Sequence, residues 1–226
     1  FTRLRLHSKL AIVTTLILLT IGTIATFLLE YHNPETMGDF SFGKKVMASM
    51  FQSVTTRTAG FFTVSQSGLT QESKLLDCIL MFIGGTAGGV KTTTIAMLVM
   101  ACITFVRGGK DTECFGRKIT MENFRTGFAV AMLAFMVFIT GTVTVLIIEP
   151  ASVPLINVMY ETASAIGTVG LTADLTPSLA RGSQVVIMVL MYVGRIGPLT
   201  LALVFAGKPN YRDKIRELPN ERIMVG

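Results

Sequence analysis

The chain has 226 residues, of which half are apolar and only 15% are charged, and its net charge is +6. A soluble domain carries about 25% charged residues, so this composition excludes a soluble globular enzyme, and a mean hydropathy of +0.60 excludes a disordered chain. Three cysteines, two of them inside apolar runs, indicate small core residues rather than a disulfide framework. We predict an all-α polytopic membrane protein.

Four apolar runs predict the membrane spans. Leu10–Leu29 and Phe128–Ile148 contain no charge, and each is long enough to cross roughly 30 Å of hydrocarbon. Val185–Ala206 is similar in length but has Arg195 at its middle. Leu75–Val106 would form a straight helix of about 48 Å, which is too long for one span. We therefore expect this run to break at its glycines.

Lysine and arginine side chains gather in three segments, before the first run, between the second and third, and after the fourth. Positive charge in short loops marks the cytoplasmic side of a membrane protein. We therefore expect a multi-pass protein in a lipid membrane, with both termini of this segment in the cytoplasm. The net positive charge then reflects the orientation of the protein in the membrane, and no nucleic-acid partner is predicted.

Two further apolar segments are too short to span a bilayer. Lys45–Thr55 lies between the first two runs and Pro154–Ala165 between the last two, with its proline where the first turn of a helix tolerates one. Each is followed by a stretch that contains glycine, Thr56–Phe61 and Ile166–Leu171. Irregular backbone at membrane depth is tolerated only where it lines a water-filled path or is buried in protein. We predict two pore helices with re-entrant loops.

A single offset of 110 residues aligns several parts of the chain. It places Thr58–Phe61 on Thr168–Leu171, and Phe82–Gly85 on Tyr192–Arg195. An offset that aligns both a loop and the middle of a span indicates internal repetition. We predict two repeats of span, pore helix, filter-like loop and span. The first occupies residues 1–110, and the second occupies residues 111–226 and ends in a cytoplasmic tail.

The loops that contain glycine predict a site for a dehydrated cation. A glycine at positive φ lets consecutive carbonyls face one side of the chain, and rings of carbonyls replace the hydration shell of K⁺ in potassium channels. The negative C-terminal ends of the pore helices favour a cation at the same place. Thr168-Val169-Gly170 matches the start of the potassium-channel filter motif. The predicted ion-binding residues are Thr56, Arg57, Thr58, Ala59, Gly60, Ile166, Gly167, Thr168, Val169 and Gly170.

Three motifs carry a resemblance to a known family. Ser53–Phe61, Gly84–Thr94 and Tyr192–Pro198 are similar to the Trk/Ktr/HKT superfamily of potassium transporters, and most closely to the membrane subunits of its bacterial Ktr branch. The resemblance covers essentially the whole chain. It implies potassium uptake across the bacterial cell membrane through a carbonyl-lined filter, with four repeats around one pore. This chain resembles the third and fourth repeats and starts with Phe rather than Met, so we expect two more filter-like segments upstream.

The resemblance also implies a gate below the filter. The broken second helix of the third repeat forms an intramembrane gating loop, which here corresponds to Gly84, Gly85, Thr86, Ala87, Gly88, Gly89, Val90 and Lys91. Arg195 aligns with Gly85, and we expect it to hold the loop carbonyls and to repel cations. The glycines could instead serve a close helix contact. A phosphate-binding loop is excluded, because Val90 intervenes between glycine and lysine and no strand precedes the motif.

Partners and ions follow from the same resemblance. It implies a homodimer of the full-length membrane subunit on a cytoplasmic RCK ring, which binds the nucleotide, with K⁺ as the transported ion and Na⁺ as an activator. The alternative is a two-repeat potassium channel that dimerises to complete its pore. No enzyme activity is expected, and His7 and His32 lack partners at metal-ligand spacing. Arg57 either faces the ion or anchors a pore helix, with Glu161 as its partner or as a separate structural anchor.

Overall fold

A computed structural model of the chain describes residues 5–83, 88–109, 112–115, 117–197 and 200. In chain order its helices are α1 (Leu6–Glu30), α2 (Phe42–Thr55), α3 (Gln71–Phe82), α4 (Thr92–Val106), α5 (Met121–Ile148), α6 (Leu155–Gly167), the 3₁₀ turn η1 (Thr176–Ser178) and α7 (Arg181–Ile196). Strands β1 (Glu113–Cys114) and β2 (Arg117–Lys118) form an antiparallel hairpin between α4 and α5. The all-α prediction is confirmed apart from this hairpin, which was not expected.

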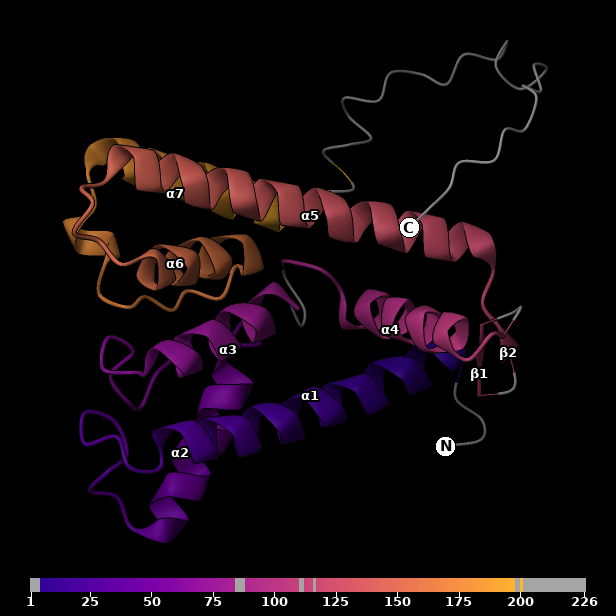
Figure 1. Cartoon of the computed structure of the whole chain (residues 1–226), viewed down its shortest axis with the longest axis horizontal. Helices are drawn as coiled ribbons and strands as arrows, with labels where there is room; N and C mark the ends of the chain where they lie inside the picture. The colour runs from indigo at the N-terminus through magenta and orange to yellow at the C-terminus, as the bar shows by residue number, and fades with distance from the viewer. Residues whose placement is uncertain (1–4, 84–87, 110–111, 116, 198–199, 201–226) are drawn as a thin grey trace.

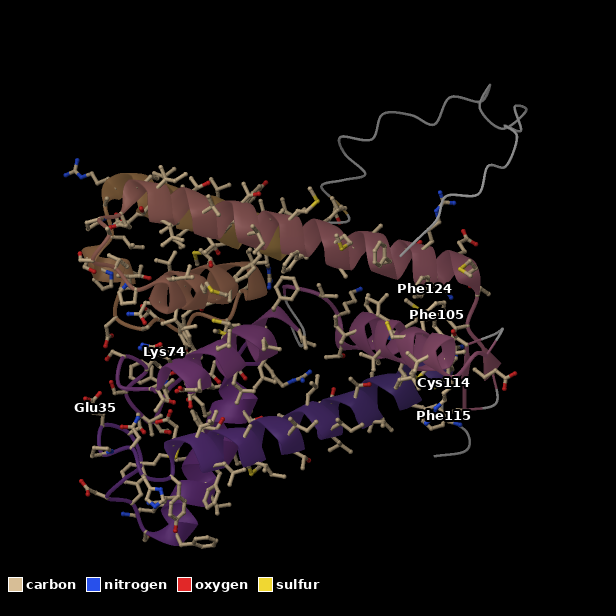
Figure 2. All side chains as sticks on the ribbon, in the orientation of Figure 1. Glu35, Lys74, Phe105, Cys114, Phe115 and Phe124 are labelled. Atoms are coloured by element: carbon tan, nitrogen blue, oxygen red, sulfur yellow. The ribbon has the colours of Figure 1, made fainter. Side chains whose placement is uncertain are left out.

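The helices run back and forth between two ends of the molecule (Figure 1). α1 and α5 run from the end where the β1–β2 hairpin lies, here called the hairpin end, to the opposite loop end, and α3, α4 and α7 run back. The short helices α2 and α6 lie in the half toward the loop end. Figure 2 places Glu35 and Lys74 at the loop end, and Cys114 and Phe115 at the hairpin end. The start of α1 and the α4–α5 connection thus share one end, as an even number of crossings between them requires.

Within the described residues, α1 and α5 are the helices long and apolar enough to cross a membrane. Only 11% and 28% of their most apolar windows is buried, so these side chains face outward, unlike those of a core helix in a soluble protein. The predicted spans Leu10–Leu29 and Phe128–Ile148 lie inside these helices. α5 starts seven residues earlier than predicted because Thr120 caps it, accepting a hydrogen bond from the Asn123 N–H at 3.5 Å.

The long apolar run breaks where predicted. α3 ends at Phe82 and α4 begins at Thr92, and the Val90 N–H donates to the Phe82 carbonyl at 3.1 Å. This hydrogen bond ties together the two flanks of the glycine-rich segment. The resulting helices have 12 and 15 residues, and each is too short to cross a bilayer alone. Residues 84–87 lie outside the described part of the chain.

The last predicted span begins four residues earlier than expected and is interrupted. Its helix, α7, covers Arg181–Ile196, Gly197 follows with a φ of +88°, and Thr200 is again helical. A glycine in this conformation ends a helix, and the residue before a proline, here Pro198, disfavours helical backbone. Arg195 therefore lies in the last turn of α7 and not at the middle of a helix. Residues 201–206 lie outside the described part of the chain.

The hydrophobic core is centred on α6. Val158, Tyr160 and Ala163 are fully buried, because α3, α5 and α7 all pack against this helix. In contrast, α2 packs mainly on α1, and its Phe42 and Met47 side chains are 68% and 74% exposed. The two short helices, which hold corresponding places in the sequence, therefore have different surroundings in the described part of the chain.

Candidate cation filter

Both predicted filter segments, Thr56–Gly60 and Ile166–Gly170, follow short helices. α2 ends at Thr55 and α6 at Gly167, so the C-terminal ends of both helices, which carry partial negative charge, adjoin these segments. Both segments were predicted to be loops, but the second is not a loop throughout. Its first two residues, Ile166 and Gly167, still belong to α6.

The same backbone handedness occurs in the two segments. Thr58 and Gly60 have φ values of +72° and +75°, and Thr168 and Gly170 have φ values of +53° and +89°. The two pairs are related by the 110-residue offset found in the sequence. Only two other non-glycine residues of the described part have positive φ. A left-handed threonine is strained, and at Thr168 this conformation also ends α6. The two segments therefore share one unusual backbone turn.

The two segments meet at their glycines. A Cβ atom on Gly60 would lie 2.5 Å from the Val169 carbonyl oxygen and 3.7 Å from the Gly170 Cα. No side chain fits there unless the backbone moves. A Cβ on Gly170 would meet only the Gly60 Cα, at 3.9 Å, so Gly170 is required by its φ rather than by space. Carbonyl-bearing backbone from both units thus converges at one point.

Each short helix fixes the loop that follows its own filter segment. The Thr55 hydroxyl accepts a hydrogen bond from the Phe61 N–H at 3.0 Å and donates to the Phe61 carbonyl. In the second unit, the Glu161 carboxylate accepts hydrogen bonds from the hydroxyls of Thr172 and Thr176, each at 2.6 Å. Glu161 is therefore a structural anchor, one of the two roles that the sequence left open.

The suggested pairing of Arg57 with Glu161 is not formed among the described residues. The Glu161 carboxylate is occupied by donors from its own unit, including the Ala173 N–H at 2.9 Å. The Arg57 Nη1 atom is buried and has no hydrogen-bond partner in the described part of the chain. A buried unpaired N–H is costly, so this position requires an acceptor that the described residues do not supply.

A buried polar network behind the segments was not predicted. Gln52 Nε2 donates to Gln66 Oε1 and to Asp77 Oδ2, both at 2.7 Å, and the Tyr160 hydroxyl donates to Gln66 Oε1 at 2.7 Å. All four side chains are buried. They come from α2, the loop after the first filter segment, α3 and α6, so the network joins the two units. Its members are too far apart in the chain to form a local sequence pattern.

Three glycines pack closely at the end of α6. Cβ atoms on Gly88 and Gly194 would lie 2.6 Å and 2.2 Å from the Ile166 carbonyl oxygen. A Cβ on Gly167 would lie 2.6 Å from the Met81 carbonyl oxygen. Glycine is therefore required at all three positions for close approach of backbone. Part of the glycine-rich segment serves packing, whatever its role in gating.

A cavity of about 620 Å³ lies on the hairpin side of α6. Its lining includes Gly88, Gly89, Lys91, Arg195, His7 and Glu122. The structure therefore brings Arg195 and the end of the predicted gating loop to one space, whereas Val90 is fully buried. Gly84, Gly85, Thr86 and Ala87 lie outside the described residues, and their contact with Arg195 stays a prediction.

Two long helices face outward with apolar side chains, and the segments that follow two short helices meet at Gly60 and Gly170. These features define a helical membrane protein with a candidate ion path. A family model for TrkH, a cation transport protein, matches residues 6–214. The chain belongs to this family, whose members are transporters and not enzymes. The resemblance drawn from the motifs is confirmed.

Three curated relatives carry names from potassium transport. The chain is 39% identical to Ktr system potassium uptake protein B of Vibrio alginolyticus, over 100% of this chain and 50% of the relative. It is 39% identical to the protein of that name in Bacillus subtilis (91% and 47%). It is 34% identical to potassium/sodium uptake protein NtpJ of Enterococcus hirae (99% and 51%). The chain thus spans about half the length of the curated relatives it matches.

A solved structure shares the fold. The crystal structure of the potassium transporter TrkH from Vibrio parahaemolyticus matches with a TM-score of 0.69 at 18% identity, over 87% of this chain and 44% of that chain. At this identity the likeness establishes the helical fold of a membrane protein.

Proposed function

We propose that the chain forms half of a potassium uptake pore, in which Thr56–Gly60 and Ile166–Gly170 supply two of the filter segments. The observation that carries this proposal is the shared left-handed backbone at Thr58 and Gly60, and at Thr168 and Gly170, where the segments converge. Left-handed residues alternating with right-handed ones turn successive carbonyls to one side, and such carbonyls replace the water around K⁺. The names of the curated relatives support K⁺ as the transported ion.

The second half of the proposed pore lies in a segment of similar length that completes four span–helix–loop–span units. Two observations support this. The curated relatives are about twice as long as the chain. In addition, α3 of the first unit covers α6, whereas the apolar face of α2 is exposed. The relatives' length favours this arrangement over a two-repeat channel that dimerises to complete its pore.

The gate of the proposed pore combines residues 84–91 with Arg195. The shared cavity and the contact of Gly88 with the end of α6 support this assignment. The Arg195 guanidinium carries five N–H donors and stays charged at physiological pH. It is therefore suited to hold loop carbonyls and to repel a passing cation.

Regulation in this proposal comes from a cytoplasmic RCK ring that binds the nucleotide, beneath a dimer of full-length membrane subunits. Na⁺ acts as an activator. The hairpin end is the cytoplasmic end, and both termini of this segment are in the cytoplasm. The Ktr system names of relatives support the partner, and the potassium/sodium name of the Enterococcus relative supports an effect of Na⁺.

The test of this function is Gly170→Ser in the full-length protein, measured as K⁺ and Na⁺ uptake by cells that lack other potassium uptake systems. A serine at φ +89° is strained by about 1 kcal/mol or more, and the neighbouring carbonyls must shift to relieve it. We expect Na⁺ to compete better with K⁺. Unchanged discrimination between the two ions, in a variant that reaches the membrane at the parent's level, would remove Gly170 from the filter.

A further inference from the structure

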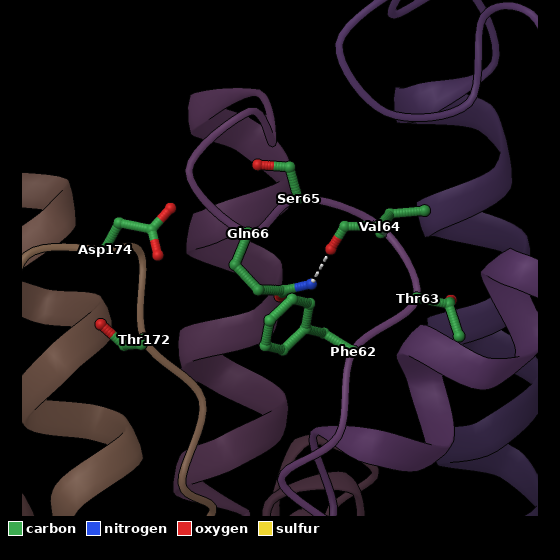
Figure 3. Close-up of a pocket in the computed structure, with 7 residues that line it drawn as sticks. All are labelled: Phe62, Thr63, Val64, Ser65, Gln66, Thr172 and Asp174. Atoms are coloured by element: carbon green, nitrogen blue, oxygen red, sulfur yellow. Dashed lines mark hydrogen bonds between the residues drawn. The ribbon is translucent and has the colours of Figure 1, made fainter.

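A second cavity lies at the loop end, directly beyond the filter segments. It has a volume of about 290 Å³ and is lined by Phe62, Thr63, Val64, Ser65, Gln66, Thr172 and Asp174 (Figure 3). Phe62 and Thr172 each follow a filter glycine by two residues. One wall therefore comes from each unit. A water molecule takes about 30 Å³ in the liquid, so the cavity has room for an ion together with several of its waters.

The chemistry of the lining suits a cation. Asp174 is the one charged side chain among the described residues that line the cavity. The Gln66 amide donors are used within the wall, since Nε2 donates to the Val64 carbonyl at 2.8 Å and to Gln52 Oε1 at 3.2 Å. The Lys74 ammonium donates to the Ser67 carbonyl and to Asn157 Oδ1, and the lysine does not line the cavity.

The Asp174 carboxylate is held in place at this mouth. Its Oδ2 atom accepts a hydrogen bond from the Ser67 hydroxyl at 2.7 Å, which links the loops of the two units. Its backbone has a φ of +62°, a conformation that aspartate and asparagine tolerate better than other residues with a Cβ. The carboxylate is therefore a fixed charge beside the cavity rather than a freely moving surface group.

We propose that this cavity is an antechamber of the pore, in which Asp174 attracts a hydrated monovalent cation before it enters the filter. The inference rests on the proposed function and adds to it a residue that sets the apparent affinity for K⁺ without setting selectivity. A cation separated from the carboxylate by one layer of water, at roughly 5–6 Å, gains an attraction that corresponds to about a threefold rise in local occupancy. Salt weakens this attraction, because the Debye length falls from about 30 Å at 0.01 M to about 3 Å at 1 M.

The experiment measures K⁺ uptake into vesicles that contain the full-length protein, at 10 mM and at 500 mM ionic strength. Asp174→Asn removes the charge but keeps the side-chain shape, the tolerance for positive φ and an acceptor for Ser67. We expect its apparent KM for K⁺ to rise about threefold at low ionic strength and the rise to disappear at high ionic strength. A KM equal to that of the parent at low ionic strength overturns the proposal.

Two control variants separate attraction from structure. Ser67→Ala breaks the hydrogen bond while keeping the charge, and we expect the parental KM. If it raises KM equally at both ionic strengths, Asp174 acts as a structural tether through Ser67 and the antechamber is wrong. A rise that disappears at high ionic strength supports the proposal, because a displaced charge attracts the cation less. Asp39→Asn removes an exposed charge on the α1–α2 connection, outside this cavity. If it raises KM equally, the effect is one of general surface charge and the proposal also fails.

The same vesicles distinguish this proposal from the proposed function. Gly170→Ser is expected to change the discrimination between K⁺ and Na⁺, whereas Asp174→Asn is expected to leave it at the parental ratio. If Gly170→Ser changes discrimination, while Asp174→Asn changes neither the apparent KM for K⁺ nor the discrimination, only the antechamber is wrong. If Gly170→Ser leaves discrimination unchanged, the filter assignment itself fails.

Discussion

Gly60→Ala is the substitution for which the structure makes the strongest claim about the filter. The new Cβ would lie 2.5 Å from the Val169 carbonyl oxygen, whereas ordinary contact begins at 3.4 Å. The oxygen or the Gly60 backbone must therefore move by almost 1 Å. Gly170→Ala is the matched comparison, because its Cβ would meet nothing nearer than 3.9 Å. Both positions have positive φ.

The two substitutions are therefore expected to have effects of different size, for a structural reason. At both positions a Cβ at positive φ costs about 1–2 kcal/mol. At Gly60 the displacement of backbone adds to this, at about 1–3 kcal/mol by analogy with overpacked cores. Because the atom displaced is a carbonyl oxygen of the second filter segment, we expect Gly60→Ala to lose both stability and ion discrimination. Gly170→Ala should lose less of each.

The assay combines the thermal unfolding midpoint of the purified full-length protein with the ratio of K⁺ to Na⁺ uptake in cells. Gly43→Ala is the control, since its Cβ would meet nothing within 4 Å and it lies in the first turn of α2. We expect that variant to match the parent or to be slightly more stable. If Gly60→Ala keeps parental discrimination, or is no worse than Gly170→Ala, the reasoning from the glycine contact is refuted.

Two further predictions test the surroundings of the filter. Tyr160→Phe removes the hydroxyl that donates to Gln66, and we expect a loss of about 0.5–1.5 kcal/mol, seen as a lower thermal unfolding midpoint. Tyr192→Phe, at a side chain 67% exposed, should leave the midpoint unchanged. Arg195→Ala should raise resting K⁺ flux in the full-length protein and reduce its dependence on nucleotide. Arg181→Ala, at the other end of α7, should do neither, and equal fluxes in parent and both variants would contradict the gate.

Local features of the fold were predictable because they depend on short stretches of sequence. The C-terminal end of α2 falls at Thr55 as predicted, because the following stretch cannot continue an apolar helix. The break between Phe82 and Thr92 follows from the glycines and from the length of the run. The limits of α7 were missed, because hydropathy continues past Gly197 while a backbone of positive φ ends the helix there.

Side-chain partners were less predictable, because they join positions distant in the chain. Glu161 was a candidate partner for Arg57, as an acidic side chain on the second predicted pore helix. The fold instead brings it to Thr172 and Thr176, which return past α6 after the filter segment. Because threonine hydroxyls are uncharged, the sequence shows no pattern of opposite charges that would predict their hydrogen bonds to a carboxylate. The network around Gln66 was missed for the same reason, since glutamine and tyrosine look like ordinary loop and helix residues.

The proposed filter and the proposed gate share a wall in this fold, which limits how each can move. The Ile166 carbonyl, in the last turn of α6, lies against the backbone of both Gly88 and Gly194. Packed backbone has two or a few arrangements rather than a continuous range, so a displacement of the proposed gating loop must also change the contact at the end of α6. Thr168 follows two residues later with its strained φ. A gate that opens by moving Gly88 is therefore expected to alter the filter backbone as well, so that conduction and selectivity change together.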